Sequence, residues 1–471
     1  MKKISFIFLI VFFSLHMTLA FAQPTLKKFI ALADIHFSPF IGCDQYTPPC
    51  PILNELRATP AQSWDLVFQK YADKISTNYR QDTDYFLLQS TLTELNTLAQ
   101  QKPLFILMLG DFIAHNFFEQ YNTYSADPSG ANDAEFMKKT FQYLAYKLNQ
   151  AAPRTNIYPA LGNNDSYTGN YLVDPNGPFL NDTADIFAAL IKDKQAREEF
   201  KDTYFNAGYY AITLPQHIRL IVLNSVLFSS LYTTSIKQKA ADEQLIWLQN
   251  QLNQANQQQQ SVLLAMHVPF GIDVFLDIKM KTDIVRYFIH PLFWQAVYNE
   301  KVLFLLQQYS SILIGTLPAH IHADTFQLIS GKDHAHFIPS STTPSISPIY
   351  GNNPGLKVFS FNDQTHELIN FDAYFYPLNE GKTAQWKQEY NFNAIYQPNC
   401  KSCSLVQGML NLHKDNRLMS SYKKYYAVSQ NTQPLTRHKK WLPYYWCNIH
   451  NTDWESYRHC ERSEATQSFQ H

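Results

Sequence analysis

The 471-residue sequence has no excess of charge of either sign. Its 38 lysine and arginine residues nearly balance 39 aspartate and glutamate residues, which leaves a formal net charge of −1. A chain without a basic or an acidic field has no general attraction for a nucleic-acid polymer or an anionic membrane. We therefore expect neither as the main partner, and a specific site must carry the function.

The sequence also lacks a long hydrophobic run after its first 22 residues. The best later stretch, residues 302–306, is followed directly by Gln307 and Gln308, whereas a membrane-spanning helix needs about 20 apolar residues. Disorder is not indicated either, because 45% hydrophobic and 16% charged residues are typical of a packed globular chain. The length is sufficient for one large domain or two ordinary ones.

The N-terminus has the pattern of a secretory signal peptide. Lys2 and Lys3 precede an apolar stretch over residues 4–15, and Ala20 and Ala22 form a small-x-small site before Gln23. The alternative is an uncleaved membrane anchor, for which the apolar stretch is short. We expect residues 1–22 to be removed and the mature protein to be soluble and secreted or periplasmic.

Cysteine is scarce, but its count is even. An even number of cysteines in an exported chain predicts disulfides. Cys43 and Cys50 are close enough in sequence to close a local loop. Cys400 and Cys403 form a CxxC unit, and because no second CxxC completes a four-ligand zinc set, a small structural disulfide is favoured over a redox or zinc site. The remaining two are Cys447 and Cys460, and the sequence does not fix the connectivity.

Several short apolar runs end where polar residues of metal-binding type begin. Runs this short, bounded by Gly, Pro, Asp or Asn, predict buried strands rather than helices. Polar residues at the exits of strands lie on loops held by a rigid scaffold, where sheet proteins usually place their chemistry. The predicted strands cover residues 29–33, 104–109, 157–161, 262–266 and 312–314.

Segments with apolar spacing near 3.6 lie between these strands, at residues 84–99, 133–148 and 244–252. The alternation of strands and helices predicts an α/β layered domain, which we place at residues 23–380. Further helices are expected over residues 382–396 and 404–428, in a small C-terminal helical subdomain at 381–432. Residues 433–471 are rich in aromatic residues without clear periodicity, and we expect a poorly defined tail there.

Five groups of polar residues follow the predicted strands in order: D-x-H, G-D, G-N, H and H-x-H. Each group alone is weak evidence, because polar loops, turns and core histidines produce the same patterns. Together they supply oxygen and nitrogen donors without a thiolate, which suits zinc, iron or manganese in a hydrolytic site. Two such ions roughly 3.5–4 Å apart need a shared carboxylate. The candidate ligands are Asp34, His36, Asp111, Asn163, His267, His320 and His322.

With these motifs the sequence resembles the calcineurin-like metallophosphoesterases, and within them the acid sphingomyelinase-like phosphodiesterase branch. Further likeness to the branch lies in residues 110–115 (GDFIAH), 222–225 (VLNS), 244–248 (QLIWL) and 343–355 (TPSISPIYGNNPG). The resemblance spans roughly residues 28–428. It implies a four-layer α/β fold, with two packed β-sheets flanked by helices, and hydrolysis of small or lipid-derived phosphodiesters.

The resemblance also implies a role for each site residue. A hydroxide between two divalent metals, zinc or else iron or manganese, would attack phosphorus in line. His115 matches the histidine of the branch that protonates the leaving alkoxide, a general-acid role. One metal would be held by Asp34, His36 and His322, the other by Asn163, His267 and His320, with Asp111 bridging the two.

Two positions depart from the family pattern. Asn164 stands where the family has a catalytic histidine, so acid catalysis would fall more heavily on His115, and Asn164 remains a catalytic candidate through its amide. Ala319 replaces a glycine before His320, which is a small change unless the backbone needs a positive φ. Neither departure removes a metal ligand, so an active enzyme is expected.

The substrate and two alternatives remain open at this stage. True sphingomyelinases of the branch carry a saposin-like domain before the catalytic core, and here only residues 23–28 separate the predicted signal from the first strand, which favours soluble, nucleotide-like diesters. The alternatives are a phosphomonoesterase on the same metals and a secreted binding protein with impaired catalysis. His334 and His336 are weaker candidates that could approach the substrate or simply lie in a loop.

Overall fold

The structure is a computed structural model that describes residues 26–127, 129–280, 290–400, 403–412, 416–430 and 439–468. The predicted signal peptide lies outside the described residues. Within the described ranges, no helix is both long and apolar enough to cross a membrane.

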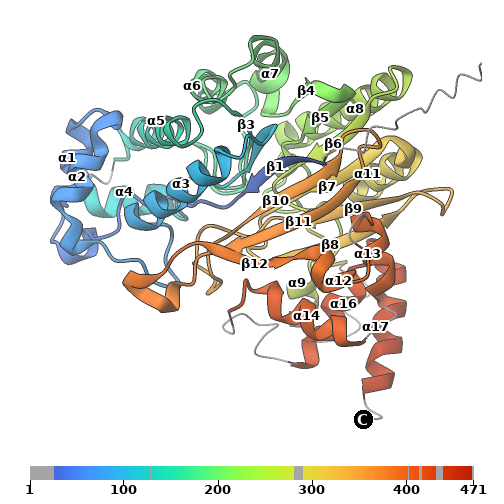
Figure 1. Cartoon of the computed structure of the whole chain (residues 1–471). Coiled ribbons are helices and arrows are strands. Elements are labelled where there is room, and N and C mark those ends of the chain that lie inside the picture. Colours follow the sequence, from blue (N-terminus) through green and yellow to red (C-terminus); the bar gives the residue numbers. More distant parts are fainter. Residues whose placement is uncertain are drawn as a thin grey trace, which may run out of the picture.

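Two six-stranded sheets form the centre of the molecule (Figure 1). The first sheet has the order β12 (Lys387–Asn391), β11 (Leu368–Phe375), β10 (Gly355–Asn362), β1 (Leu26–Leu32), β2 (Phe105–Leu109) and β3 (Asn156–Ala160). The second has the order β4 (Tyr210–Leu214), β5 (Ile218–Val222), β6 (Ser261–Ala265), β7 (Leu313–Leu317), β9 (Phe337–Thr342) and β8 (Thr325–Ser330). This arrangement confirms the predicted fold class of two β-sheets flanked by helices.

The five strands predicted from apolar runs are all present, and their burial explains why the runs are continuous. In β6, Leu263 and Ala265 pack into the larger core with β1 and β2. The alternate residues Val262, Leu264 and Met266 pack into a second core with α8 (Ser235–Gln257) and α11 (Ala296–Gln308). Because successive side chains of a strand point to opposite faces, a strand covered on both faces must be apolar at every position.

Helices cover the outer faces of the two sheets (Figure 1). The predicted helices over 84–99, 133–148 and 244–252 appear as α3, α5 and part of α8. Asp84 begins α3 by accepting a hydrogen bond from the Leu87 amide at 2.8 Å, which is a typical N-cap contact. The α-helices that the structure describes before residue 310 are α1 (Pro51–Ala58), α2 (Trp64–Lys70), α3 (Tyr85–Ala99), α4 (Phe117–Ser125), α5 (Asp133–Ala151), α6 (Pro178–Ala188), α7 (Lys194–Ala207), α8 (Ser235–Gln257), α9 (Val274–Lys279) and α11 (Ala296–Gln308).

The helix predicted over residues 382–396 is wrong in its first part. Residues 387–391 form β12, which pairs antiparallel with β11, with Tyr390 opposite Ala373. Tyr390 is buried and stacks on Tyr425 with ring centroids 4.1 Å apart. Pairing with the open edge of β11 and the burial of Tyr390 outweigh the preference of the isolated segment for a helix. Helices then follow as α12 (Phe392–Tyr396), α13 (Leu405–Asn411) and α14 (Asn416–Tyr426), and the last two confirm the helical prediction over 404–428.

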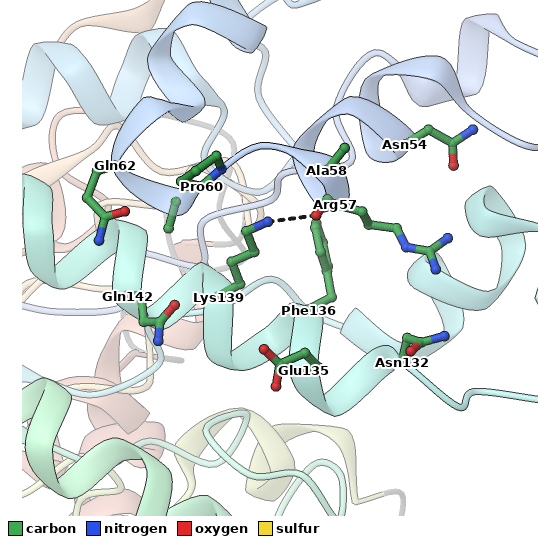
Figure 2. A pocket seen from close by; sticks show the side chains of 11 residues that line it. Asn54, Arg57, Ala58, Pro60, Gln62, Asn132, Glu135, Phe136, Lys139 and Gln142 are labelled. Atoms are coloured by element: carbon green, nitrogen blue, oxygen red, sulfur yellow. Dashed lines mark hydrogen bonds between the residues drawn. The ribbon is translucent and has the colours of Figure 1, made fainter.

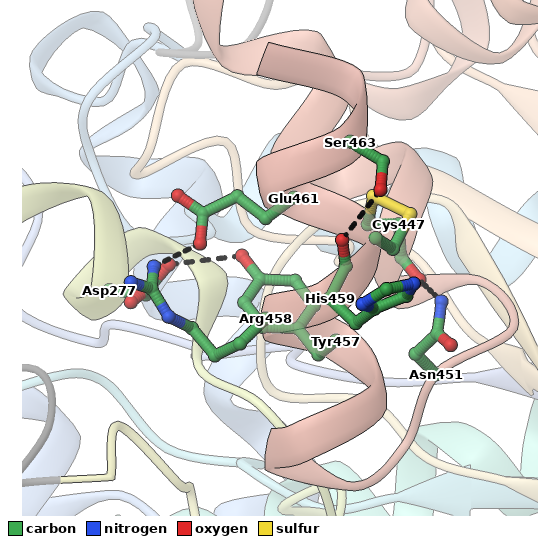
Figure 3. Close-up of a disulfide and its surroundings, with 9 residues drawn as sticks. Asp277, Cys447, Asn451, Tyr457, Arg458, His459, Glu461 and Ser463 are labelled. Atoms are coloured by element: carbon green, nitrogen blue, oxygen red, sulfur yellow. Dashed lines mark hydrogen bonds and ion pairs between the residues drawn. A yellow bond between two sulfur atoms is a disulfide. The ribbon is translucent and has the colours of Figure 1, made fainter. Parts of the chain in front are cut away.

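Two further helices, α16 (Leu442–Asn448) and α17 (Trp454–Ser468), lie where the sequence shows no periodicity. Cys447 and Cys460 join them by a disulfide (Figure 3). The Tyr457 hydroxyl on α17 donates a hydrogen bond to Asp277 on α9 at 3.0 Å, so this helix pair is docked onto the part of the chain that carries the second sheet. The predicted disulfides Cys43–Cys50 and Cys400–Cys403 are confirmed.

Candidate metal centre

The five groups of predicted ligands follow strands whose carboxyl ends lie at one edge of the sheets. β1, β2 and β3 are parallel neighbours in the first sheet, and β6 and β7 are parallel neighbours in the second. Backbone hydrogen bonds join the loops after these strands: the Asp34 amide donates to the Gly110 carbonyl and the Ala319 amide donates to the His267 carbonyl, both at 2.9 Å. Each of these bonds joins loops of one sheet, and the His320 amide, which donates to Asp34 Oδ2 at 3.3 Å, links the loops of the second sheet to those of the first. The site therefore lies between the two sheets.

One carboxylate oxygen lies between histidines from the two sheets. Asp111 Oδ2 is 3.3 Å from Nε2 of His36, which follows β1, and 3.3 Å from Nε2 of His267, which follows β6. Candidate ligand atoms of Asp34, His36 and Asp111 all lie within 4.8 Å of one another, and the same is true of Asp111, His267 and His320. Asp111 is common to both groups, which is the position required of a bridging ligand.

The remaining predicted ligands lie beside these two groups. His322 Nε2 is 3.3 Å from Asp34 Oδ1 and 3.2 Å from His36 Nε2. On the other side, Asn163 Oδ1 is 3.0 Å from His267 Nε2. The Asn163 amide nitrogen donates to Asn170 Oδ1 at 2.8 Å, and this contact turns the side-chain oxygen toward His267. The structure thus brings all seven predicted ligands together.

The residues present fit a pair of divalent cations. Asp34 Oδ1 is buried and accepts no hydrogen bond from the part of the chain that the structure describes, although His322 Nε2 lies nearby. Such burial costs free energy unless a cation or a similar group satisfies the oxygen. Nδ1 of His36 donates to the Ile113 carbonyl at 3.1 Å, and Nδ1 of His267 donates to the Leu109 carbonyl at 2.7 Å. Since a carbonyl can only accept, these contacts leave the Nε2 lone pairs for a metal.

Five of the seven predicted ligands have a left-handed backbone. Such a conformation is uncommon for residues other than glycine and costs about 1–3 kcal/mol at each position. Asp, Asn and His tolerate it better than most residue types. The surrounding packing must hold these loops in place, and their clustering at one point is typical of a functional site. The φ angles are 50° at Asp34, 43° at His36, 54° at Asp111, 75° at His320 and 53° at His322.

A second buried carboxylate, Asp165, holds two of the site loops together. Its oxygens accept hydrogen bonds from the backbone amides of Asp111 and Gly162 at 2.8 Å and of Phe112 at 2.9 Å. Burial and the nearby charge of Asp111 raise the pKa of Asp165 to about 7, while the backbone hydrogen bonds act in the opposite direction. Asp165 therefore connects the loop after β2 to the loop after β3.

Burial lowers the pKa values of two site histidines, whereas a third is raised by the bridging carboxylate. It lowers the pKa of His36 well below its usual value, with a further contribution from His115, and it lowers the pKa of His320 to about 3. Burial also acts to lower the pKa of His267, but the charge of Asp111 outweighs it and raises this pKa to about 9. Burial would raise the pKa of Asp111, yet the charges of His267 and His36 bring it well below the usual value. A neutral imidazole and an ionised carboxylate are the states that bind metals. The shifts favour these states at His36, His320 and Asp111, whereas a metal would have to displace a proton from His267.

His115 lies against the ligands on the His36 side. Its ring stacks on that of His36 with centroids 3.9 Å apart, and its Nδ1 donates to Asp82 Oδ1 at 2.9 Å. Burial acts to lower the pKa of His115, but the hydrogen bond and charge of Asp82 outweigh it and raise the pKa above the usual value. Ligand-type atoms of His36, His115 and His322 also lie within 4.8 Å of one another, so geometry alone permits His115 to be either a proton donor or a metal ligand.

The side chain of Asn164 points at the bridging carboxylate. Its Nδ2 donates to Asp111 Oδ2 at 2.9 Å, and its backbone amide donates to Asp111 Oδ1 at 2.8 Å. The histidine that the family has at this position would be a proton donor, whereas this amide orients Asp111.

The structure also adds three residues that the sequence did not single out and excludes two weak candidates. Asp82, Tyr171 and Tyr350 contact site histidines: the Tyr171 hydroxyl is 3.0 Å from His320 Nε2, and the Tyr350 ring is 4.7 Å from that of His322 between centroids. Only Tyr350 belongs to a segment that carries the family resemblance.

His334 and His336 lie in the turn between β8 and β9, where they contact Ser330 and Asp333 instead of the site.

A pocket of about 600 Å³ lies away from this centre, between α1 and α5 (Figure 2). Lys139 extends along it and donates to the Arg57 carbonyl at 2.7 Å, at the end of α1. None of the predicted site residues lines this pocket. A much smaller pocket, about 60 Å³, adjoins the centre and is lined in part by Asn116, Asn164 and Asn170. The chemistry of the donor set, and not pocket size, identifies the site.

The fold and this donor set define a phosphoesterase of the calcineurin-like class: residues 27–301 match the family described as "Calcineurin-like phosphoesterase", and the chain belongs to it. Residues 334–467 match the "Acid sphingomyelin phosphodiesterase C-terminal region". The predicted membership of the acid sphingomyelinase-like phosphodiesterase branch is thereby confirmed, and with it the predicted class of enzyme, a phosphoric ester hydrolase. The family also implies a dinuclear metal site, which agrees with the two groups that share Asp111.

Similar proteins of known activity cover most of the chain. "Cyclic GMP-AMP phosphodiesterase SMPDL3A" from Homo sapiens is 23% identical over 452 residues, which are 93% of this chain and 90% of that protein. "Acid sphingomyelinase-like phosphodiesterase 3b" from Mus musculus is 23% identical over 427 residues, covering 87% and 85%. "Sphingomyelinase phosphodiesterase C" from Dictyostelium discoideum is 25% identical over 374 residues, covering 76% and 77%.

Proposed function

We propose that this enzyme is an exported phosphodiesterase that uses two divalent metal ions to hydrolyse small or lipid-derived phosphodiesters. The observation that carries the proposal is the position of Asp111 Oδ2, which is 3.3 Å from a histidine of each sheet. Asp34, His36 and His322 would hold one ion. Asn163, His267 and His320 would hold the other.

The bound ions would stabilise charge on the phosphoryl oxygens and lower the pKa of a water nucleophile. The chain itself supplies two further functions. Asn164 and Asn170 orient the ligand oxygens of Asp111 and Asn163 through the hydrogen bonds described above. His115 has Nδ1 committed to Asp82, which leaves Nε2 to give a proton to the departing alkoxide.

Metal content and ester preference together test the proposal. Elemental analysis of the purified active protein should give two equivalents of zinc, iron or manganese per chain. Bis-p-nitrophenyl phosphate should be hydrolysed faster than p-nitrophenyl phosphate. Active protein without a transition metal would refute the dinuclear site, and a preference for the monoester would favour the phosphomonoesterase alternative. Metal-loaded protein without turnover of either ester would favour a binding protein with impaired catalysis.

For the substrate, we propose soluble diesters such as nucleotide derivatives ahead of sphingomyelin in a bilayer. The supporting observations are the similarity over 93% of the chain to a cyclic GMP-AMP phosphodiesterase and the net charge of −1, which gives little attraction to anionic bilayers. Turnover of a dinucleotide and of sphingomyelin in detergent-free vesicles should be compared at equal phosphodiester concentration. Efficient hydrolysis of the vesicle lipid without hydrolysis of the dinucleotide would reverse this assignment.

Export is supported by the three disulfides, because disulfides persist in oxidising compartments. Thiol titration of the exported protein under denaturing, non-reducing conditions should find no free cysteine. Six free thiols would contradict the proposed location.

A further inference from the structure

We infer that Asp82 is a positioning residue for catalysis, which holds the His115 ring in the orientation and tautomer that let it protonate the leaving group. The inference rests on the proposed function. Asp82 belongs to no motif of the sequence and is not among the candidate metal ligands.

Asp82 binds His115 at two points with its two carboxylate oxygens. Oδ2 accepts the backbone N–H of His115 at 2.9 Å, and Oδ1 accepts the ring Nδ1–H at 2.9 Å. The Asp82 side chain is 6% exposed and that of His115 is 22% exposed, so water competes little for the carboxylate. Contacts to both the backbone and the ring of one residue fix the position of the loop and the rotation of the imidazole together.

Asp82 is itself attached to the segment that carries a predicted metal ligand. The amide of the next residue, Thr83, donates to the His36 carbonyl at 3.0 Å, and the Ser38 amide donates to the Thr83 carbonyl at 2.9 Å. The Ser347 hydroxyl donates to Asp82 Oδ1 at 3.3 Å. These contacts tie the carboxylate to the backbone of His36, on whose ring His115 stacks. Backbone hydrogen bonds between residues 36–37 and 111–114 already hold the two loops together, and Asp82 adds the contact that fixes the His115 ring itself.

The tautomer follows from the hydrogen-bonding capacity of the carboxylate. An ionised carboxylate only accepts, so the His115 Nδ1 must carry a hydrogen and Nε2 is the nitrogen that exchanges its proton. As a hydroxide nucleophile forms its bond to phosphorus, the bond between phosphorus and the leaving oxygen breaks. The electron pair of the broken bond moves to the leaving oxygen, and the Nε2 proton of the doubly protonated His115 transfers to it. His115 is then neutral and still donates Nδ1–H to Asp82, which remains a carboxylate throughout.

Substrates with different leaving groups test this role. Asp82→Asn should lower kcat on a dinucleoside monophosphate, whose leaving group is an alkoxide, by about 10²–10⁴-fold, the usual contribution of a positioned acid. On bis-p-nitrophenyl phosphate, whose leaving group departs without a proton, the loss should be less than about 3-fold, which is under 1 kcal/mol of transition-state stabilisation. Asp73→Asn is the matched control, since Asp73 lies on the same connection and its side chain is 71% exposed; both rates should be unchanged.

A double-mutant cycle distinguishes positioning from a general structural role. If Asp82 acts through His115, Asp82→Asn should cost nothing further on the dinucleoside monophosphate in a His115→Ala background. An additional loss in that background, or equal losses on both substrates, would overturn the inference. Asp82→Glu keeps the charge and moves the carboxylate by one methylene. It should lower kcat on the dinucleoside monophosphate selectively, but by a smaller factor than Asp82→Asn. It replaces Asp82→Asn in the comparison if that variant folds poorly.

Metal analysis of every variant separates this inference from the proposed function. Two metal equivalents and normal p-nitrophenyl ester turnover in Asp82→Asn would leave the proposed function standing whatever happens on the alkoxide substrate. Absence of metal from the active wild-type enzyme would instead refute the proposed function.

Discussion

Asp111 connects the two halves of the centre through one side chain. Its Oδ2 faces His36 on one side and His267 on the other. Removal of this carboxylate should affect both metals together, in contrast to the removal of a ligand that serves only one of them.

We expect Asp111→Ala to lose both metal equivalents and all measurable diesterase activity. Elemental analysis and turnover of bis-p-nitrophenyl phosphate on the same sample provide the measurement. Asp44→Ala, at an exposed position, is the control and should retain both. A variant that keeps one full metal equivalent would show that Asp111 belongs to one ion only.

Asn164 allows a test of how the orientation of Asp111 affects metal binding. Because its Nδ2 donates to Asp111 Oδ2, Asn164→Ala should weaken metal binding by about 10–100-fold, the usual effect of removing a group that orients a ligand. Competition with a chelator measures this affinity. Unchanged affinity together with a large loss of kcat would mean that the amide contacts the substrate in the working enzyme.

The seven candidate ligands could be selected from the sequence, but the geometry that brings them together could not. Seven residues at strand exits are visible as motifs because their types and order are restricted by metal chemistry. Their left-handed φ angles depend on long-range packing that no local pattern records. Asp82 is hidden for a related reason: it is a single aspartate whose partner, His115, lies 33 residues away, and a lone carboxylate in a connecting segment has no distinctive pattern.

At the scale of elements, prediction succeeded where burial is complete and failed where pairing decides the structure. The strands at β1, β2, β3, β6 and β7 are apolar on both faces, and this produces a signal in the sequence. β12, with the sequence KQEYN, has mostly exposed or half-buried side chains and exists because β11 offers a free edge. The predicted helix at this place was wrong because the segment alone gives no information about that edge.

β12 also carries a carboxyl group with an unusual titration. The oxygens of Glu389 are buried, and burial, with the nearby charge of Asp324, raises the pKa of Glu389 to about 8. The nearby Ser429 and the charges of Lys357 and Lys424 oppose this shift. Between the ordinary glutamate pKa and 8, the folded chain holds a proton that the unfolded chain has released. Stability therefore falls as the pH rises through this window.

We expect Glu389→Gln to flatten this dependence. The free energy of unfolding of the wild type should fall between about pH 5 and 8 by an amount on the order of a few kcal/mol, and that of the variant should fall by less. Urea unfolding at a series of pH values measures the difference. Parallel curves for the two proteins would show that Glu389 is ionised in the folded state at neutral pH.

At the scale of the whole molecule, the C-terminal helices are secured at two points. One is the disulfide between Cys447 and Cys460, and the other is the hydrogen bond from Tyr457 to Asp277 (Figure 3). The disulfide closes a loop over a sequence separation of 13, and a loop of this size restricts the unfolded chain appreciably.

Replacement of both Cys447 and Cys460 by serine should lower the free energy of unfolding by about 2–4 kcal/mol and leave metal content unchanged. Thermal unfolding with and without reductant provides the check, since reductant should lower the Tm of the wild type more than that of the variant. Loss of metal in the double variant would show that the C-terminal helices support the catalytic centre as well as the fold.

The location of the centre between the two sheets has a consequence for the lifetime of the enzyme. Four proposed ligands follow strands of the first sheet and three follow strands of the second, so the bound ions would cross-link the two layers. By mass action, an ion present at 1,000 times its Kd adds about 4 kcal/mol to the folded state. The supply of metal around the enzyme would then set how long each molecule survives proteases, and molecules that never acquired their ions would be the first to be degraded.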